Sequence, residues 1–116
     1  MNRSFPARLA EVKIREAQYD LQTKEVSLEN KARTYLNEME TTENQIILWD
    51  RTVNDYEGLL NGERNMFDQG ESSLFMVNRR EVGYINARIK LINLITKNRK
   101  SKIKTLYMYG ILNEAL

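Results

Sequence analysis

The chain has 116 residues, of which 41% are hydrophobic and 29% are charged, and its formal net charge is +2. It contains no Cys and no His, which excludes a disulfide framework, a thiolate nucleophile, and the usual general base and metal ligand. One proline and five scattered glycines favour long amphipathic helices over a loop-rich β-sandwich. No apolar run is long enough for a transmembrane helix, and the first ten residues lack the apolar core of a signal peptide.

A seven-residue repeat predicts one long helix over about residues 7–67. One row of the repeat consists of Ile14, Leu21, Leu28, Tyr35, Thr42, Trp49 and Tyr56. The other row consists of Ala32, Met39, Ile46, Val53, Leu60 and Phe67. Seven residues make nearly two helical turns, so both rows share one face, as in a coiled coil. We therefore interpret Trp49 and Tyr56 as seam residues rather than as a ligand cage.

A turn over about residues 68–72 and a second helix over about residues 73–112 follow. Gly70 can end the first helix in a left-handed conformation, and Ser72 or Ser73 can cap the second. The second helix repeats the pattern in the rows Phe75, Val82, Ile89, Thr96, Ile103 and Asn78, Ile85, Ile92, Arg99, Leu106. The predicted fold class is all-α: residues 1–116 form a single segment, a long antiparallel helical hairpin or coiled coil.

The distribution of charge and of surplus apolar residues suggests how the arms associate. Residues 1–71 hold nine basic and fourteen acidic side chains, whereas residues 72–116 hold nine basic and two acidic ones. Such segments attract each other in an antiparallel pair. One seam does not absorb all the remaining apolar residues, which are Ile47, Leu48, Leu59, Leu91, Leu94 and Ile95. Further helices, from other chains or from another part of the same chain, are expected to cover them. The alternative is a helical-bundle dimer with no further role.

The stretch from Phe67 to Glu81, FDQGESSLFMVNRRE, resembles the second periplasmic hairpin tip of TolC-like outer-membrane efflux proteins. Ser4-Phe5-Pro6 resembles the family's exit from its last outer-membrane strand, and the stretch from Leu106 to Leu112 resembles the end of the ascending helix. The resemblance spans Phe5 to about Leu112. It implies that the chain corresponds to the last helical hairpin of such a protein, without the strands and the first hairpin.

Proteins of that family are homotrimers whose helices form a tapered tunnel, an α-barrel, across the periplasm of Gram-negative bacteria. A β-barrel in the outer membrane tops the tunnel, and this chain lacks that part. A periplasmic adaptor, joined to an inner-membrane pump, docks at the tip, which the resemblance places at Gly70, Glu71, Ser72, Ser73 and Leu74. The alternative interpretation is that these residues only cap the two helices.

The family's tunnel entrance carries an acidic ring just beyond the tip, and the matching positions here are Met76 and Arg79. Neither residue is acidic, so a cation-attracting ring is not expected in this chain. Arg79 and Arg80 would favour anions if they faced the lumen. Alternatively, both arginines pair across the turn with Glu71, Glu81 or Asp68.

A dense basic run offers a second class of function, nucleic-acid binding, through Lys97, Arg99, Lys100, Lys102 and Lys104. The run lacks interleaved aromatic residues, and Ile103 and Leu106 keep the expected seam spacing, so a solvated helix face is favoured and nucleic acid is not an expected partner. The carboxylates lie mostly off the apolar rows, and the sequence has no phosphate loop, serine–base pair or metal-ligand spacing. We therefore expect no enzyme activity, cofactor or metal. The predicted function is a tunnel segment of a TolC-like channel; the alternative is a stand-alone coiled-coil scaffold or a nucleic-acid-binding hairpin.

Overall fold

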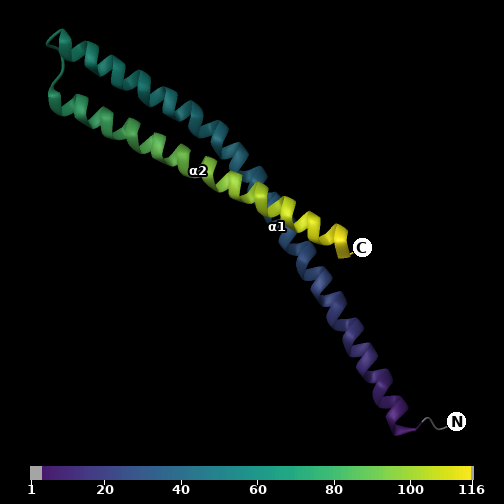
Figure 1. Cartoon of the computed structure of the whole chain (residues 1–116). Coiled ribbons are helices and arrows are strands. Elements are labelled where there is room, and N and C mark those ends of the chain that lie inside the picture. Colours follow the sequence, from purple (N-terminus) through teal and green to yellow (C-terminus); the bar gives the residue numbers. More distant parts are fainter. Residues whose placement is uncertain (1–3, 116) are drawn as a thin grey trace.

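The computed structural model describes residues 4–115 and consists of two antiparallel helices, α1 (Phe5–Asp68) and α2 (Leu74–Ala115) (Figure 1). They form a rod of 100 × 23 × 14 Å. The predicted all-α hairpin is confirmed, with no strand in the described residues. The helices exceed their predicted bounds by two or three residues at their outer ends. Pro6 lies in the first turn of α1, where its missing N–H removes no helical hydrogen bond.

The inner seam of α1 follows the two predicted rows between Leu28 and Leu60. Ala32, Val53 and Leu60 are buried, and the half-buried members are Leu28, Tyr35, Met39, Ile46, Trp49 and Tyr56. The predicted placement of Trp49 and Tyr56 in the seam is therefore confirmed. Because these residues alternate at spacings of three and four, α1 keeps one face against α2 over this whole length.

The predicted seam rows of α2 are wrong. The helix turns the opposite side toward α1, with Val77, Ala87, Leu94, Asn98, Ser101, Thr105 and Met108 buried and Tyr84 and Leu91 half-buried. The residues expected in the seam, Ile103 and Leu106 among them, are exposed instead. Both sides of α2 repeat every seven residues, and the side with smaller side chains lets the two backbones approach. Leu91 and Leu94, expected on the outside, are therefore seam residues.

The first part of α1 projects beyond the end of α2 (Figure 1). Ile14 and Leu21 belong to the predicted row but are 58% and 59% exposed, because no described segment lies opposite them. Phe67, at the other end of its row, is 42% exposed because α1 ends one residue later. The coiled-coil pattern of α1 is thus longer than the seam that α2 covers.

Ion pairs join the acidic arm to the basic arm along the rod. Lys97 pairs with Glu38 at 3.6 Å, and Lys102 pairs with Glu43 at 3.5 Å. Both pairs are solvent-accessible, so each contributes at most about 1 kcal/mol to stability. Their main effect is to favour the antiparallel arrangement of two oppositely charged arms.

Candidate functional site

The end of the hairpin is built by a helix C-cap around Gly70. Gly70 has φ of +75°, a conformation that other residues adopt only with strain. The N–H of Glu71 donates to the carbonyl of Met66 at 2.7 Å, and the N–H of Gly70 donates to the carbonyl of Phe67 at 3.0 Å. These two bonds form a Schellman motif, which satisfies carbonyls that the end of α1 would otherwise leave unpaired. The predicted role of Gly70 is confirmed.

The two serines of the turn both face the hairpin itself. The Oγ atom of Ser73 accepts a hydrogen bond from the N–H of Met76 at 3.2 Å, so Ser73 is the N-cap of α2. The Ser72 hydroxyl donates to Oε2 of Glu63 at 2.9 Å, and the Nε–H of Arg80 donates to Oε1 of the same carboxylate at 3.4 Å. Glu63 is only 7% exposed, so this carboxylate holds the turn to both helices from inside.

The outer surface of the turn is more apolar than the predicted site. Of the five predicted docking residues, Gly70, Glu71, Ser73 and Leu74 are exposed, and Ser72 is half-buried against Glu63. Three further side chains lie exposed within a few residues of the turn: Met66, Phe67 and Phe75. Their signal was visible in the sequence, because an apolar residue beside a helix end often stays outside the seam. We define the tip surface as Met66, Phe67, Gly70, Glu71, Leu74 and Phe75.

The residues predicted near a tunnel entrance occupy three different environments. Met76 is half-buried, and Arg79 is exposed and makes no ion pair among the described residues. Arg80 pairs with Glu63, which was not among the three expected partners. Glu81, which was among them, pairs with Arg64 of α1 at 3.2 Å. Of Met76, Arg79 and Arg80, Arg79 is thus the one charged side chain that is exposed without an ion pair among the described residues.

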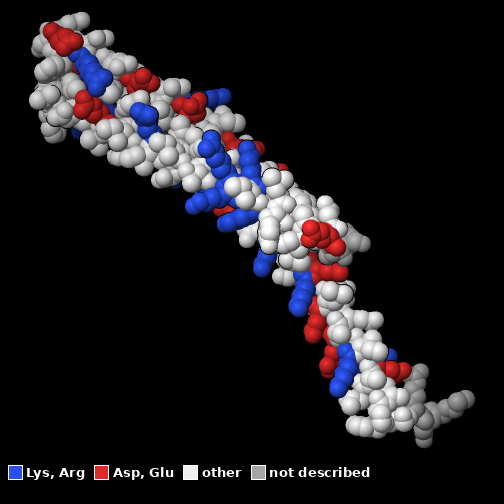
Figure 2. All heavy atoms as spheres, in the orientation of Figure 1, with Lys and Arg blue, Asp and Glu red and all other residues white. Residues whose placement is uncertain are grey.

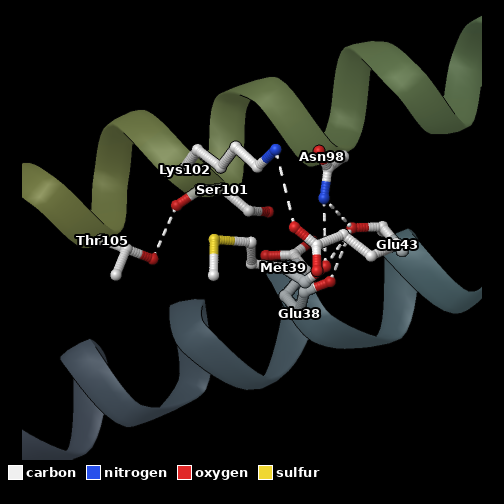
Figure 3. A network of polar contacts seen from close by, with 8 residues as sticks. Glu38, Met39, Glu43, Asn98, Ser101, Lys102 and Thr105 are labelled. Carbon is white, nitrogen blue, oxygen red and sulfur yellow. Dashed lines mark hydrogen bonds and ion pairs between the residues drawn. The ribbon is translucent and has the colours of Figure 1, made fainter.

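A polar layer interrupts the apolar seam midway along the rod (Figure 3). The side-chain amide of Asn98 donates to the carbonyl of Met39 and to the Thr42 hydroxyl, both at 3.0 Å. Thr42 in turn donates to the carbonyl of Glu38 at 2.8 Å. Two turns beyond Asn98 along α2, the Thr105 hydroxyl donates to the carbonyl of Ser101 at 2.7 Å. A buried Asn that pairs across a seam favours one register of the two helices, and this contact agrees with the offset that the short turn at Gly70 imposes.

The basic run lies about halfway along the rod, where blue side chains gather (Figure 2). Lys97 and Lys102 are engaged in ion pairs with α1, and the Lys104 ammonium lies 5.3 Å from the centre of the Tyr35 ring. Arg99 and Lys100 are exposed without an ion pair among the described residues. Most of the run is thus occupied in holding α2 to α1.

Between residues 4 and 115, no three Asp, Glu, Cys or His side chains come together as a metal site. Neither of the two helices, within their described lengths, combines the length and apolar composition that a membrane crossing requires. Comparison with protein-family models, with curated proteins and with solved structures gave no match for this chain.

Proposed function

We propose that the chain is a wall segment of a periplasmic efflux tunnel of the TolC-like kind, with its hairpin end directed toward a periplasmic adaptor. The observation that carries this proposal is the two-sided character of α2. One side packs against α1, while the other side exposes large apolar residues over the same length. A helix in a closed wall has a neighbour on each side, whereas a helix in an isolated hairpin has only one.

The tip surface supports the second half of the proposal. Leu74 and Phe75 are 60% and 71% exposed at the end of a rod, where no seam can bury them. The carboxylate of Glu63 and the cap at Ser73 hold the turn in one conformation without using these side chains. A rigid end with exposed apolar side chains suits end-to-end contact with another protein, because little conformational entropy is lost on docking.

The proposed setting is a homotrimeric channel of the outer membrane, of which this chain forms part of the periplasmic portion. The adaptor and the inner-membrane pump are its proposed partners. Nucleic-acid binding is the less favoured function, since Lys97, Lys102 and Lys104 already interact with α1. A stand-alone scaffold would share the hairpin but would give no reason for the apolar residues at its end.

A graft tests the proposal. Residues 5–112 replace the corresponding hairpin of a TolC-like channel, and dye efflux, adaptor cross-linking and trimer yield are measured. The graft should assemble and export. Leu74→Asp should then reduce export and cross-linking while trimer yield is unchanged, because a buried charge without a partner disfavours docking. Leu74→Met, which keeps an apolar side chain, is the matched control and should export normally.

Two results would count against the proposal in different ways. A graft that yields no trimer would contradict the proposal that the chain is a wall segment. Full export by the Leu74→Asp graft with an unchanged adaptor cross-link would contradict only the proposal that its tip docks an adaptor. Ser73 is unsuitable for this test because its hydroxyl caps α2. Changing it would alter folding and docking together.

A further inference from the structure

A row of exposed polar side chains runs along α2 between its buried side and its apolar side. Its members lie seven, four, three, four, three and four residues apart, and such spacing keeps them on one side of a helix. Five of them are cationic and two are amides. We call this set the cationic row: Arg79, Asn86, Lys90, Asn93, Lys97, Lys100 and Lys104, all of which are exposed.

Two contacts with α1 place the cationic row along one side of the hairpin. The ammonium of Lys97 lies 3.6 Å from the Glu38 carboxylate, and that of Lys104 lies 5.3 Å from the centre of the Tyr35 ring. The Lys97 side chain is nevertheless 59% exposed, so its charge still reaches the solvent. The row has three further cations without an ion pair among the described residues: Arg79, Lys90 and Lys100.

The opposite side of the hairpin has a different charge. There, Lys102 of α2 pairs with Glu43 of α1 at 3.5 Å. Within residues 37–57, the acidic residues of α1 that share this side lie three or seven positions apart: Glu40, Glu43, Asp50 and Glu57. The side with the cationic row has only the paired Glu38 and Asp55 in the same stretch, among uncharged residues that include Asn37, Thr41, Asn44 and Gln45. One side of the hairpin is therefore strongly positive, and the other holds most of the acidic side chains of α1.

Such a row attracts anions and repels cations. Where several copies of the row line a narrow water-filled passage, their fields add, and the low-dielectric wall concentrates them in the passage. Rings of Lys and Arg are the side chains that select anions in pores. The amides of Asn86 and Asn93, exposed between the cations, can donate hydrogen bonds to the same anions.

We infer that the cationic row faces the interior of the tunnel and makes anionic solutes its preferred cargo. The inference rests on the proposed function and deepens it, because it names the charge class of the exported substrate. It also separates Arg79 from Arg80. Arg80 is half-buried and paired with Glu63, so it does not belong to the row.

Two features favour this orientation of the hairpin over the reverse one. Arg79 is the first member of the row, and the resemblance places it at the tunnel entrance. The row is also polar over its whole length, as the wall of a water-filled passage has to be. The opposite side of the hairpin instead includes Ile47 and Tyr109, which are 57% and 45% exposed.

The attraction of anions is tested first on the full chain. Pyrophosphate, a compact anion of several charges, is titrated into isotope-labelled protein at low salt, and the backbone amide signals are followed by NMR. The largest shifts should occur at Lys90, Asn93 and Lys100, and they should fade as salt is added. Lys90→Gln/Lys100→Gln should lose these shifts. Arg88→Gln/Lys102→Gln, which removes the same charge from the opposite side of α2, is the matched control and should keep them. Shifts of equal size around Arg88 would overturn the inference.

The ion selectivity of the graft of residues 5–112 tests which side of the hairpin faces the interior. The channel is placed in a planar bilayer between concentrated and dilute KCl, and the reversal potential gives the ratio of chloride to potassium permeability. The graft should favour chloride. Lys90→Gln/Lys100→Gln should lower that ratio several-fold, because two cations per chain leave the passage. Arg88→Gln/Lys102→Gln should leave it unchanged.

The outcomes separate this inference from the proposed function. A graft that forms no conducting trimer contradicts the proposed function, on which the inference rests. A conducting graft without a chloride preference contradicts the inference alone. A preference that changes only with Arg88→Gln/Lys102→Gln would also overturn it, because the opposite side of the hairpin would then line the passage.

Discussion

The apolar character of the two sides of α2 is the reverse of what a simple hydrophobic core would show, in which the buried side is the more apolar one. Its inner side, against α1, includes Ala87, Asn98 and Ser101, which are small or polar, whereas its outer side carries Ile85 and Ile92. The more apolar side is the one that the hairpin leaves exposed. Close approach and polar pairing therefore distinguish the seam within one chain, and the large side chains of the other side of α2 stay exposed.

The physical reason lies in how each side chain is satisfied. Asn98 finds its hydrogen-bond partners only at the inner seam, where Met39 and Thr42 lie within 3.0 Å. If α2 were rotated so that Ile85 and Ile92 faced α1, the Asn98 amide would be hydrogen-bonded by water instead. The seam would then lose the polar contact that favours one register. The isoleucines of the exposed side stay in contact with water in the hairpin alone, so the free energy that their burial would release is available only to an association with another helix.

The largest expected effect contrasts one residue from each side. Leu94 is 6% exposed and Ile92 is 54% exposed, although they are two residues apart. Leu94→Ala should lower the free energy of unfolding by about 2–4 kcal/mol, because it leaves a cavity in the seam. Ile92→Ala should cost less than about 1 kcal/mol in the dilute monomer, because little buried area is lost. Urea denaturation followed by circular dichroism measures both.

Concentration is the control for this pair. The cost of Ile92→Ala should grow as the protein concentration rises and association adds to stability, while that of Leu94→Ala should change little. Equal costs in dilute solution would mean that the two sides of α2 are not distinct as described.

The next effect concerns the charged member of the inner face. Glu63→Ala should destabilise the hairpin by about 1–3 kcal/mol, because Ser72 and Arg80 lose a nearly buried partner at the turn. Glu57, which is exposed on the same helix, serves as the control, and Glu57→Ala should change stability by no more than about 0.5 kcal/mol. Thermal unfolding of the two variants makes the comparison. Indistinguishable melting temperatures would show that the contacts of Glu63 contribute nothing net.

A smaller change in stability is expected for the polar layer, with a larger change in order. Asn98→Leu replaces a hydrogen-bonded amide by an apolar side chain, so the free energy of unfolding should shift by less than about 1.5 kcal/mol in either direction. The register should become less defined because no polar contact marks it. Spin labels at the exposed positions Gln45 and Lys100 should show a broader distance distribution in the variant. A distribution as narrow as in the native chain would assign the register to packing alone.

The sequence predicted the hairpin because its determinants are local. Heptad spacing, Gly70 at the turn and a serine before an apolar run each have one dominant structural outcome. The two helices and the turn at Gly70 were confirmed, and of the two serines proposed as the cap of α2 the structure shows Ser73. The seam of α1 was predicted correctly for the same reason, since its residues from Leu28 to Leu60 form one continuous inner face. The seam of α2 did not, because both of its sides repeat every seven residues and counting apolar residues favours the wrong one.

The contacts of the candidate site depend on separations that a linear pattern does not show. Glu63 meets Ser72 across nine residues and Arg80 across seventeen, and the expected partners of the arginines were their nearest acidic neighbours instead. Because its contact with Glu63 was not predicted, Ser72 was placed among the docking residues of the tip. Once the offset of the two helices is known, the partner of each turn residue follows, but a pattern counted along one helix does not give that offset.

The smallest expected effect tests how closely the inner side of α2 approaches α1. A Cβ atom at Gly83 would lie 3.0 Å from Cε1 of Tyr56, whereas one at Gly58 would have nothing within 4 Å. Alanine in a helix interior is favoured over glycine by about 1 kcal/mol, so Gly58→Ala should stabilise the hairpin by up to that amount. Gly83→Ala should gain nothing or lose stability, because the half-buried Tyr56 ring must move.

A double-mutant cycle separates the ring from the helix propensity. In a Tyr56→Ala background the obstructing ring is gone, so Gly83→Ala should recover a gain similar to that of Gly58→Ala, with a coupling between the two sites of about 0.5–1 kcal/mol. Chemical denaturation of the four variants gives this coupling directly. Equal gains in the free energy of unfolding at Gly58 and Gly83 in the native background would mean that the Tyr56 ring moves aside without cost. Close approach of the backbones would then not explain why the side of α2 with smaller side chains faces α1. A measurable coupling would support that explanation, because it would show that the backbones are near enough for one methyl group to matter.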